Sequence, residues 1–279
     1  MVIANTIVFF YRWWHGTCKF KGAGWIIKGL ARGLQGLQHY PLDVPGRGRV
    51  ILDLRDVGAF TWLNYVVDGR HPEEALLTLI RALARPGQVL WDVGANVGLV
   101  SALCKWEGGG FQRIESFEPN PALCQGLNEV FSGDNVVRVH AVALGETNST
   151  SLLMRRRGDS LRSSLVDGGG DEVEVVVRTG DSMVEEASVE APDIIKLDTE
   201  GFEVQVLSGL EKTIIAHRPA LLLERSPALE AIVPRYSALG YTGCYITRDG
   251  RLTINPRNPE CGHNCALIPP GVDISSLLI

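Results

Sequence analysis

The sequence lacks an apolar run long enough to cross a bilayer. Its longest, from Val2 to Tyr11, is far shorter than the roughly 20 residues that a spanning helix needs. It also lacks a basic start followed by an A-x-A-like cleavage site, and its six cysteines are scattered along the chain. We therefore expect a cytoplasmic protein with free thiols.

Two glycine motifs that grip phosphates are also missing. The glycines after the apolar segment Val89–Trp91 match neither the G-x-G-x-x-G dinucleotide fingerprint nor the G-x-x-x-x-G-K-[ST] P-loop. No Lys, Ser or Thr stands ready there for phosphates and Mg²⁺. This pattern disfavours a nicotinamide dehydrogenase.

A basic body is absent as well. The net charge is −5, yet residues 1–42 contain Arg12, Lys19, Lys21, Lys28 and Arg32 and no acid. The remaining residues therefore carry a net charge of −10. Nucleic-acid binding needs a basic footprint, so we expect no nucleic-acid partner.

What the sequence does contain is the segment V-L-W-D-V-G-A-N-V-G-L, from Val89 to Leu99. Apolar residues run as a strand into Asp92, a turn follows from Gly94 to Gly98, and apolar residues then resume at helical spacing. Such a turn brings backbone N–H groups and a helix N-terminus to one point, which is how α/β folds hold a nucleotide-like ligand. The acid before the turn favours an amine-bearing ligand over a pyrophosphate.

A second motif, F-E-P-N-P, spans Phe117 to Pro121. It places Glu118 twenty residues beyond Gly98, at the end of the expected second strand, where such folds hydrogen-bond a ribose diol. A ligand with an amine and a ribose, and without a need for phosphate contacts, points to S-adenosylmethionine as the cofactor.

Further along, apolar strand patterns alternate with helical ones. Ser226-Pro227 has the residue types of a helix start, and Arg248-Asp249-Gly250 is typical of a hairpin turn. We predict an α/β fold: a doubly wound, mostly parallel sheet with an antiparallel edge hairpin. Residues 1–49 would form a basic, aromatic N-terminal extension that ends in a polar turn over 41–49, and residues 50–279 would form the catalytic domain.

Five motifs together resemble the FkbM family of S-adenosylmethionine-dependent methyltransferases. They are D-V-G-A-N-V-G (92–98), F-E-P-N-P (117–121), V-A-L-G (142–145), I-I-K-L-D-T-E-G-F-E-x-x-V-L-x-G (194–209) and the looser H-N-x-x-L-I-P (263–269). The fourth is the most discriminating, and the resemblance covers roughly residues 50–270. It implies a class I methyltransferase fold, similar to a Rossmann fold, and O-methylation of a sugar, glycolipid precursor or small-metabolite hydroxyl.

The resemblance also implies roles for individual residues around the cofactor. Asp92 and the turn from Gly94 to Gly98 would surround its amino acid end, Glu118 would bind the ribose hydroxyls, and the 142–144 turn would border the adenine. For that last turn, plain packing at a strand end is an equally good interpretation. The cofactor-binding residues would be Asp92, Gly94, Ala95, Asn96, Gly98, Glu118, Asn120, Val142 and Ala143.

The catalytic candidates are Asp198, Glu200 and His263. Asp198 and Glu200 follow the strand I-I-K-L at the carboxyl edge of the sheet, where an acceptor hydroxyl needs a base. Asp198 could instead bind the cofactor amine, or a divalent cation together with Glu200. His263 titrates near neutrality, although a lone histidine is often an ordinary surface residue.

Other acids and one lysine lie near the same edge. Glu203 fits a helix-dipole role in the first turn of a helix. Lys196 shares a strand face with Asp198, and Glu224 projects from the end of the next strand.

Two further segments allow alternative interpretations. The excursion over residues 154–170, with Ser160, Ser163 and Ser164 among arginines, fits a lid for a polar substrate or a solvated loop. The segment Cys261–Cys265 has a C-x-x-x-C spacing but lacks a second ligand pair, so we expect no bound metal.

The extension has an apolar stripe, Ile27, Leu30, Leu34 and Leu37, with cations elsewhere. This pattern fits a helix on a membrane surface, or a cap packed on the catalytic domain or on a second subunit, and the many glycines favour the cap. Peripheral membrane contact through residues 1–42 and a homodimer both stay open. An alternative function is a non-catalytic scaffold that docks to a membrane or partner through these residues.

Overall fold

The computed structural model describes residues 2–18, 23–69, 73–107, 110–155, 165 and 171–279. Its centre is an eight-stranded sheet with the order β12-β11-β13-β10-β9-β3-β4-β5. These strands are β3 (Val89–Val93), β4 (Arg113–Phe117), β5 (Val137–His140), β9 (Ile194–Leu197), β10 (Ala220–Glu224), β11 (Thr242–Thr247), β12 (Leu252–Thr253) and β13 (Cys261–Ile268).

The sheet is parallel from β5 to β10 and antiparallel beyond it. Strand β13 inserts between β10 and β11 and runs against both, and β11 forms the expected edge hairpin with β12. The prediction of a doubly wound, mostly parallel sheet with an antiparallel edge is confirmed. The architecture is that of a class I methyltransferase.

Alternate residues of each central strand enter two different cores. In β3, Leu90 faces one core and Trp91 the other, and in β10 Leu222 and Leu223 divide in the same way. The first core includes α5 (Glu74–Leu83), α6 (Leu99–Trp106) and α7 (Pro121–Val130), and the second includes α8 (Gly180–Glu185), α9 (Glu203–Ser208), α10 (Glu211–His217) and α11 (Pro227–Ala238). Both faces of the sheet are covered, as buried parallel strands require.

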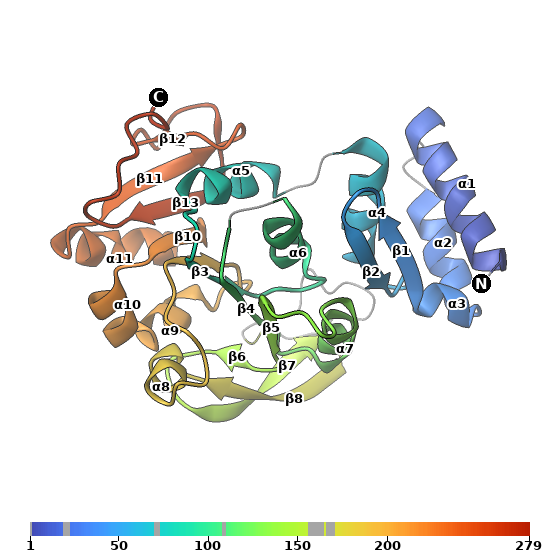
Figure 1. Ribbon diagram of the computed structural model, residues 1–279, viewed down its shortest axis with the longest axis horizontal. Coiled ribbons are helices and arrows are strands. Elements are labelled where there is room, and N and C mark those ends of the chain that lie inside the picture. Colours follow the sequence, from blue (N-terminus) through green and yellow to red (C-terminus); the bar gives the residue numbers. More distant parts are fainter. Residues whose placement is uncertain (1, 19–22, 70–72, 108–109, 156–164, 166–170) are drawn as a thin grey trace.

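A second, smaller sheet with the order β6-β8-β7 lies beside β4 and β5 (Figure 1). Its strands are β6 (Ala143–Leu144), β7 (Ser149–Arg155) and β8 (Asp171–Arg178). The predicted lid over 154–170 falls almost entirely outside the described residues.

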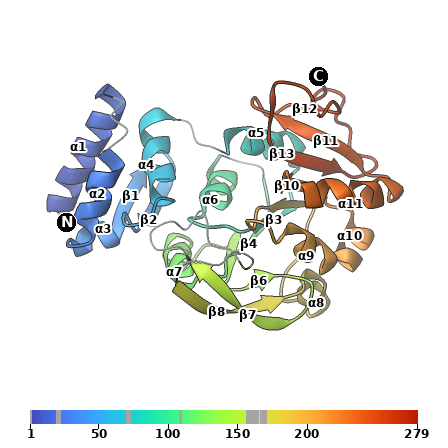
Figure 2. The same ribbon diagram turned by 180° about the vertical axis from the view of Figure 1, so that it is seen from behind.

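The N-terminal part forms a separate layer at one end of the molecule, far from the C-terminal strands in both the front and back views (Figures 1 and 2). It comprises α1 (Val2–Cys18), α2 (Ala23–Ala31), α3 (Gln35–Gln38), β1 (Tyr40–Val44), β2 (Gly48–Leu52) and α4 (Ala59–Asp68). The prediction of a polar turn over 41–49 is wrong, because Tyr40–Val44 pairs antiparallel with Gly48–Leu52. Pro41 is accommodated because β1 has only one partner strand, and an edge strand does not need every N–H.

Candidate active site

The turn between β3 and α6 has a backbone that only glycine fits well. Gly94 has a φ of +76°, and a Cβ built there would lie 1.9 Å from the carbonyl oxygen of Asp198. Gly98 has the same φ, and its Cβ would lie 2.4 Å from Leu127 Cδ2. Asn96 between them also has a positive φ, of 51°. The two glycines therefore let the turn lie directly against β9 and α7.

Asp92 lies beneath this turn and is fully buried. Its Oδ1 is 3.2 Å from Lys196 Nζ, and its Oδ2 accepts hydrogen bonds from the Ser101 backbone N–H (3.1 Å) and hydroxyl (2.6 Å). Asp92 and Lys196 are register partners on adjacent strands, which explains the pairing. The carboxylate therefore does not form part of the cavity wall described below.

Lys196 connects Asp92 to the turn. Its ammonium group donates to the carbonyl oxygen of Gly94 at 2.8 Å and lies 3.8 Å from Asp198 Oδ2. Burial alone would lower the pKa of Lys196, but the Asp92 and Asp198 carboxylates outweigh it and raise that pKa above its usual value. The lysine therefore stays charged and holds the turn in place.

Glu118 lies at the end of β4, opposite the same turn. Its Oε2 accepts from the Asn96 N–H (2.9 Å) and its Oε1 from the Asn120 N–H (2.8 Å). Burial raises the pKa of Glu118 to about 7, although the two N–H donors pull it down. Asn120 is buried and caps α7, with its side chain accepting from the Ala122 N–H.

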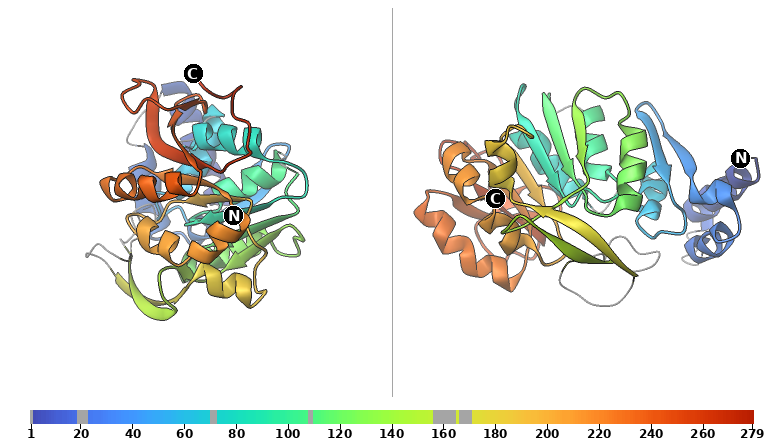
Figure 3. Two further views of the ribbon diagram at one scale, coloured as in Figure 1. Left: turned by 90° about the vertical axis from the view of Figure 1, so that its left-hand side faces the viewer. Right: turned by 90° about the horizontal axis from the view of Figure 1, so that it is seen from below.

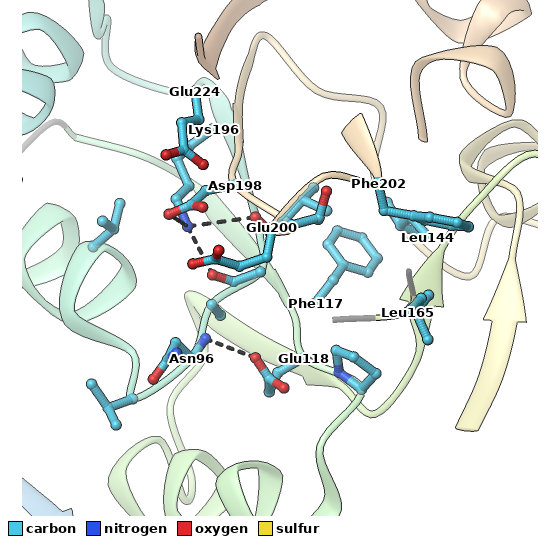
Figure 4. Close-up of a pocket in the computed structure, with 18 of the residues that line it drawn as sticks. Asn96, Phe117, Glu118, Leu144, Leu165, Lys196, Asp198, Glu200, Phe202 and Glu224 are labelled. Carbon is cyan, nitrogen blue, oxygen red and sulfur yellow. Dashed lines mark hydrogen bonds and ion pairs between the residues drawn. The ribbon is translucent and has the colours of Figure 1, made fainter. Parts of the chain in front are cut away.

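A cavity of about 340 Å³ opens above these groups, within the size range of small-molecule sites (Figure 4). We name three parts of its wall. The turn end consists of Gly94, Ala95, Asn96 and Glu118; the apolar wall consists of Phe117, Val142, Ala143, Leu144, Leu165 and Phe202; the acidic end consists of Glu73, Asp198, Glu200 and Glu224.

The acidic end gathers carboxylates from three places in the chain. Asp198 and Glu200 follow β9, Glu224 ends β10, and Glu73 precedes α5. Burial raises the pKa of Glu224, and the Asp198 and Glu203 charges raise it further. Burial likewise raises the pKa of Glu73, against the opposing charge of Lys196. Acids brought together in this way retain protons better than solvated ones.

His263 lies outside this wall. It is exposed on β13, next to Glu224, and its charge opposes the rise in the pKa of Glu224. Its backbone carbonyl accepts from the Arg225 N–H at 2.7 Å. The structure thus brings Asp198 and Glu200 to the cavity and leaves His263 at its outer margin.

Glu203 organises the loop that presents Glu200. It is buried, and its Oε1 accepts from the Thr199 N–H (2.9 Å), the Thr199 hydroxyl (3.0 Å) and the Gly201 N–H (3.1 Å). Glu200 and Gly201 both have positive φ, of 54° and 100°. The helix-dipole interpretation of Glu203 therefore misses its main contact, which is with the loop preceding the helix.

Two contributors to the site had no recognisable signal in the sequence. Glu73 is one, and the other is α4, which provides Thr61 to the cavity wall. The next residue, Trp62, is fully buried and donates through Nε1 to the carbonyl oxygen of Val97 at 3.2 Å. Glu73 and Thr61 both come from segments whose position depends on tertiary packing.

Within the described ranges, no three His, Cys, Asp or Glu side chains are arranged to hold a metal ion. Cys261 and Cys265 are free thiols, as are Cys104, Cys124 and Cys244.

Comparison with known proteins identifies a family. Residues 92–241 match the family model described as the methyltransferase FkbM domain. The hexuronic acid methyltransferase AglP of Haloferax volcanii is 30% identical over 151 residues, covering 51% of this chain and 58% of AglP. The chain thus spans little more than half of that relative.

Two solved structures are more distant. FkbM methyltransferase from Methylobacillus flagellatus is 18% identical, with a TM-score of 0.46 over 75% of this chain and 53% of that one. A precorrin-6Y C5,15-methyltransferase from Geobacter metallireducens is 14% identical, with a TM-score of 0.39 over 71% of this chain and 86% of that one.

Proposed function

The chain belongs to the FkbM methyltransferase family, and from this premise we propose that it methylates a hydroxyl of an uncharged sugar or similar polyhydroxyl acceptor, with S-adenosylmethionine as the donor. The observation that carries the proposal is the cavity itself. It combines a carboxylate for a ribose diol, an apolar wall for a purine, and a separate group of acids beyond them.

The residues of the turn end and apolar wall fit the donor. Glu118 has one N–H donor on each oxygen, which leaves a lone pair on each for the ribose hydroxyls. Phe117, Leu144 and Phe202 offer the apolar surface that an adenine ring requires. When bound, S-adenosylmethionine supplies a methyl group on a positively charged sulfur. Asp92 would act through Lys196 and the turn, since it is buried beneath them.

The acidic end fits the task of binding the acceptor and taking its proton. A carboxylate is a better proton acceptor near neutral pH when its pKa is raised, and burial raises that of Glu224. We assign proton removal to Glu224, and orientation of the acceptor hydroxyls to Asp198 and Glu200. His263, at the outer margin, would adjust the basicity of Glu224. The protein's contribution is then largely the alignment of two bound reactants.

The charge of the acidic end favours an uncharged acceptor. Among the described residues that line the cavity, Lys196 is the one cation, and it is already engaged by Asp92 and the Gly94 carbonyl. A uronic acid carboxylate placed beside Glu73, Asp198 and Glu224 would meet like charges. AglP is named for hexuronic acid, so on this proposal the two proteins differ in their acceptors.

The test is methyl transfer from labelled S-adenosylmethionine to a panel of neutral glycosides, hexuronic acids and lipid extracts. We expect label in a neutral glycoside, as an ether by NMR. Glu118→Ala should abolish the transfer, whereas the exposed control Glu260→Gln should not change it. Label found only in a hexuronic acid would contradict the acceptor assignment. No binding of donor or demethylated donor at millimolar concentration would contradict the function itself.

A further inference from the structure

Helices α1 and α2 expose an unusual number of large apolar side chains. Trp25 is 78% exposed, Ile3 66% and Phe9 64%. In the described part of the chain, every strongly exposed Phe or Trp lies in these two helices. We call this set the outer apolar face: Ile3, Phe9, Phe10, Trp13, Trp25, Ile26 and Leu30. A concentration of exposed aromatic residues of this kind marks a binding surface.

The opposite face of the same helices is already packed. Ala4, Val8 and Tyr11 of α1 and Ile27 of α2 are buried in the first core. The Tyr11 hydroxyl donates to Asn64 Oδ1 of α4 at 2.7 Å, and the Tyr11 ring meets Phe60 edge to face, with centroids 5.6 Å apart. The helices therefore cover α4. This packing keeps the outer apolar face turned away from the core.

The part of the sequence that forms this face is basic. Residues 1–42 hold five cations and no acid, although the rest of the chain is strongly acidic. Lys28 Nζ lies 5.8 Å from the Trp25 ring centroid, so cation and aromatic group occur together. Aromatic side chains at the level of lipid headgroups, with Lys and Arg beside them, characterise helices that lie in the membrane interface.

We propose that the outer apolar face binds the surface of a bilayer containing anionic lipids. The helices would lie on the membrane, because no helix in the described ranges is long and apolar enough to cross it. A second copy of the chain fits less well. A symmetric dimer through this face would bring two sets of cations together, and like charges opposed across an interface are unfavourable.

Docking here would place the cavity close to the membrane-binding layer. Helix α4 lies between the two, with Phe60 against Tyr11 and the adjacent Thr61 in the cavity wall. In the view from below, α1 and α2 lie at the end of the molecule opposite the C-terminal strands (Figure 3). The proposal rests on the N-terminal helices alone, so it stands or falls separately from the methyl-transfer activity.

The test is co-sedimentation of the full chain with vesicles of phosphatidylcholine, with and without phosphatidylglycerol. Binding should require the anionic lipid and weaken as NaCl rises, because salt screens the cations. The double variant Phe10→Ser/Trp25→Ser should bind about a hundredfold more weakly, since burial of each ring strengthens the partition equilibrium about tenfold. Ile254→Ser is the matched control, because Ile254 is 67% exposed at the opposite end of the chain.

Thermal unfolding and light scattering complete the test. Unchanged melting temperatures of the variants, together with selective loss of vesicle binding, would support the proposal. Failure of the wild-type chain to sediment with anionic vesicles would overturn it. So would equal binding by the double variant, or a dimer that this variant converts to a monomer.

Discussion

The turn end and the acidic end of the cavity both depend on carboxylates, yet these are held in different ways. At the turn end, Glu118 and the underlying Asp92 are buried and have fixed donors on both oxygens or a lysine beside them. At the acidic end, Glu200 is exposed and the Asp198 side chain is 38% exposed. The first arrangement is enclosed by protein donors before any ligand binds, whereas the second is open to solvent, where an acceptor hydroxyl can reach it.

The largest effect should come from disturbing the turn end at Gly94. In Gly94→Ala the new methyl group would overlap the Asp198 carbonyl oxygen, so the turn must move away from β9. We expect loss of donor binding and a decrease of more than about 3 kcal/mol in the free energy of unfolding. Calorimetry and urea unfolding would measure both.

Gly46→Ala is the matched control, because Gly46 has a φ of +73° and open space around it. It should cost only the backbone strain, about 1 kcal/mol, and leave donor binding intact. Equal effects of the two substitutions would show that the close approach to β9 is unimportant.

A substitution at the acidic end should lower catalytic activity and leave the stability of the fold almost unchanged. Glu224→Gln keeps the shape of the side chain but cannot accept the proton, so kcat should fall by about 10²–10⁴-fold. The donor affinity and the melting temperature should stay close to those of the wild type. A Glu224→Gln variant with normal kcat would remove Glu224 from the mechanism and transfer the role to Asp198 or Glu200.

A smaller effect should appear as a pH dependence of stability. Burial raises the pKa of Glu118 from its ordinary value of 4.5 to about 7 in the folded chain, so the folded state binds this proton more tightly. The stabilisation is complete below about pH 4.5 and is lost as the pH rises through about 7, a change of about 3 kcal/mol. The free energy of unfolding of wild type should therefore fall more steeply between pH 5 and about pH 8 than that of Glu118→Gln. Parallel curves would contradict the raised pKa.

The features predictable from the sequence were those that short stretches of chain determine. The β3 turn requires glycine at two positions, Glu118 is held by neighbours within its own motif and the turn, and Ser226 caps α11 at the expected place. In each case the partner groups lie close in sequence or are backbone atoms of a recognisable motif.

The features that were missed depend on packing between distant segments. Strand β1 can include Pro41 because it pairs with β2 alone. The sequence does not reveal that a strand here would have a single partner. Thr61 reaches the cavity from α4 and Glu73 from the residue before α5, both ahead of the main sheet in the sequence. Asp92 is covered because its register partner is Lys196. Roles that depend on such neighbours cannot be read from residue type alone.

The most direct test of the account is titration calorimetry with the demethylated donor, S-adenosylhomocysteine, from about pH 6 to about pH 8. Ribose hydroxyls donate hydrogen bonds to the ionised Glu118 carboxylate, so the wild-type affinity for S-adenosylhomocysteine should rise as the pH increases through about 7. Below that pH, binding should release a proton from Glu118. Glu118→Gln should bind more weakly and without this dependence. Wild-type binding that is pH-independent and unaffected by the substitution would place the donor elsewhere.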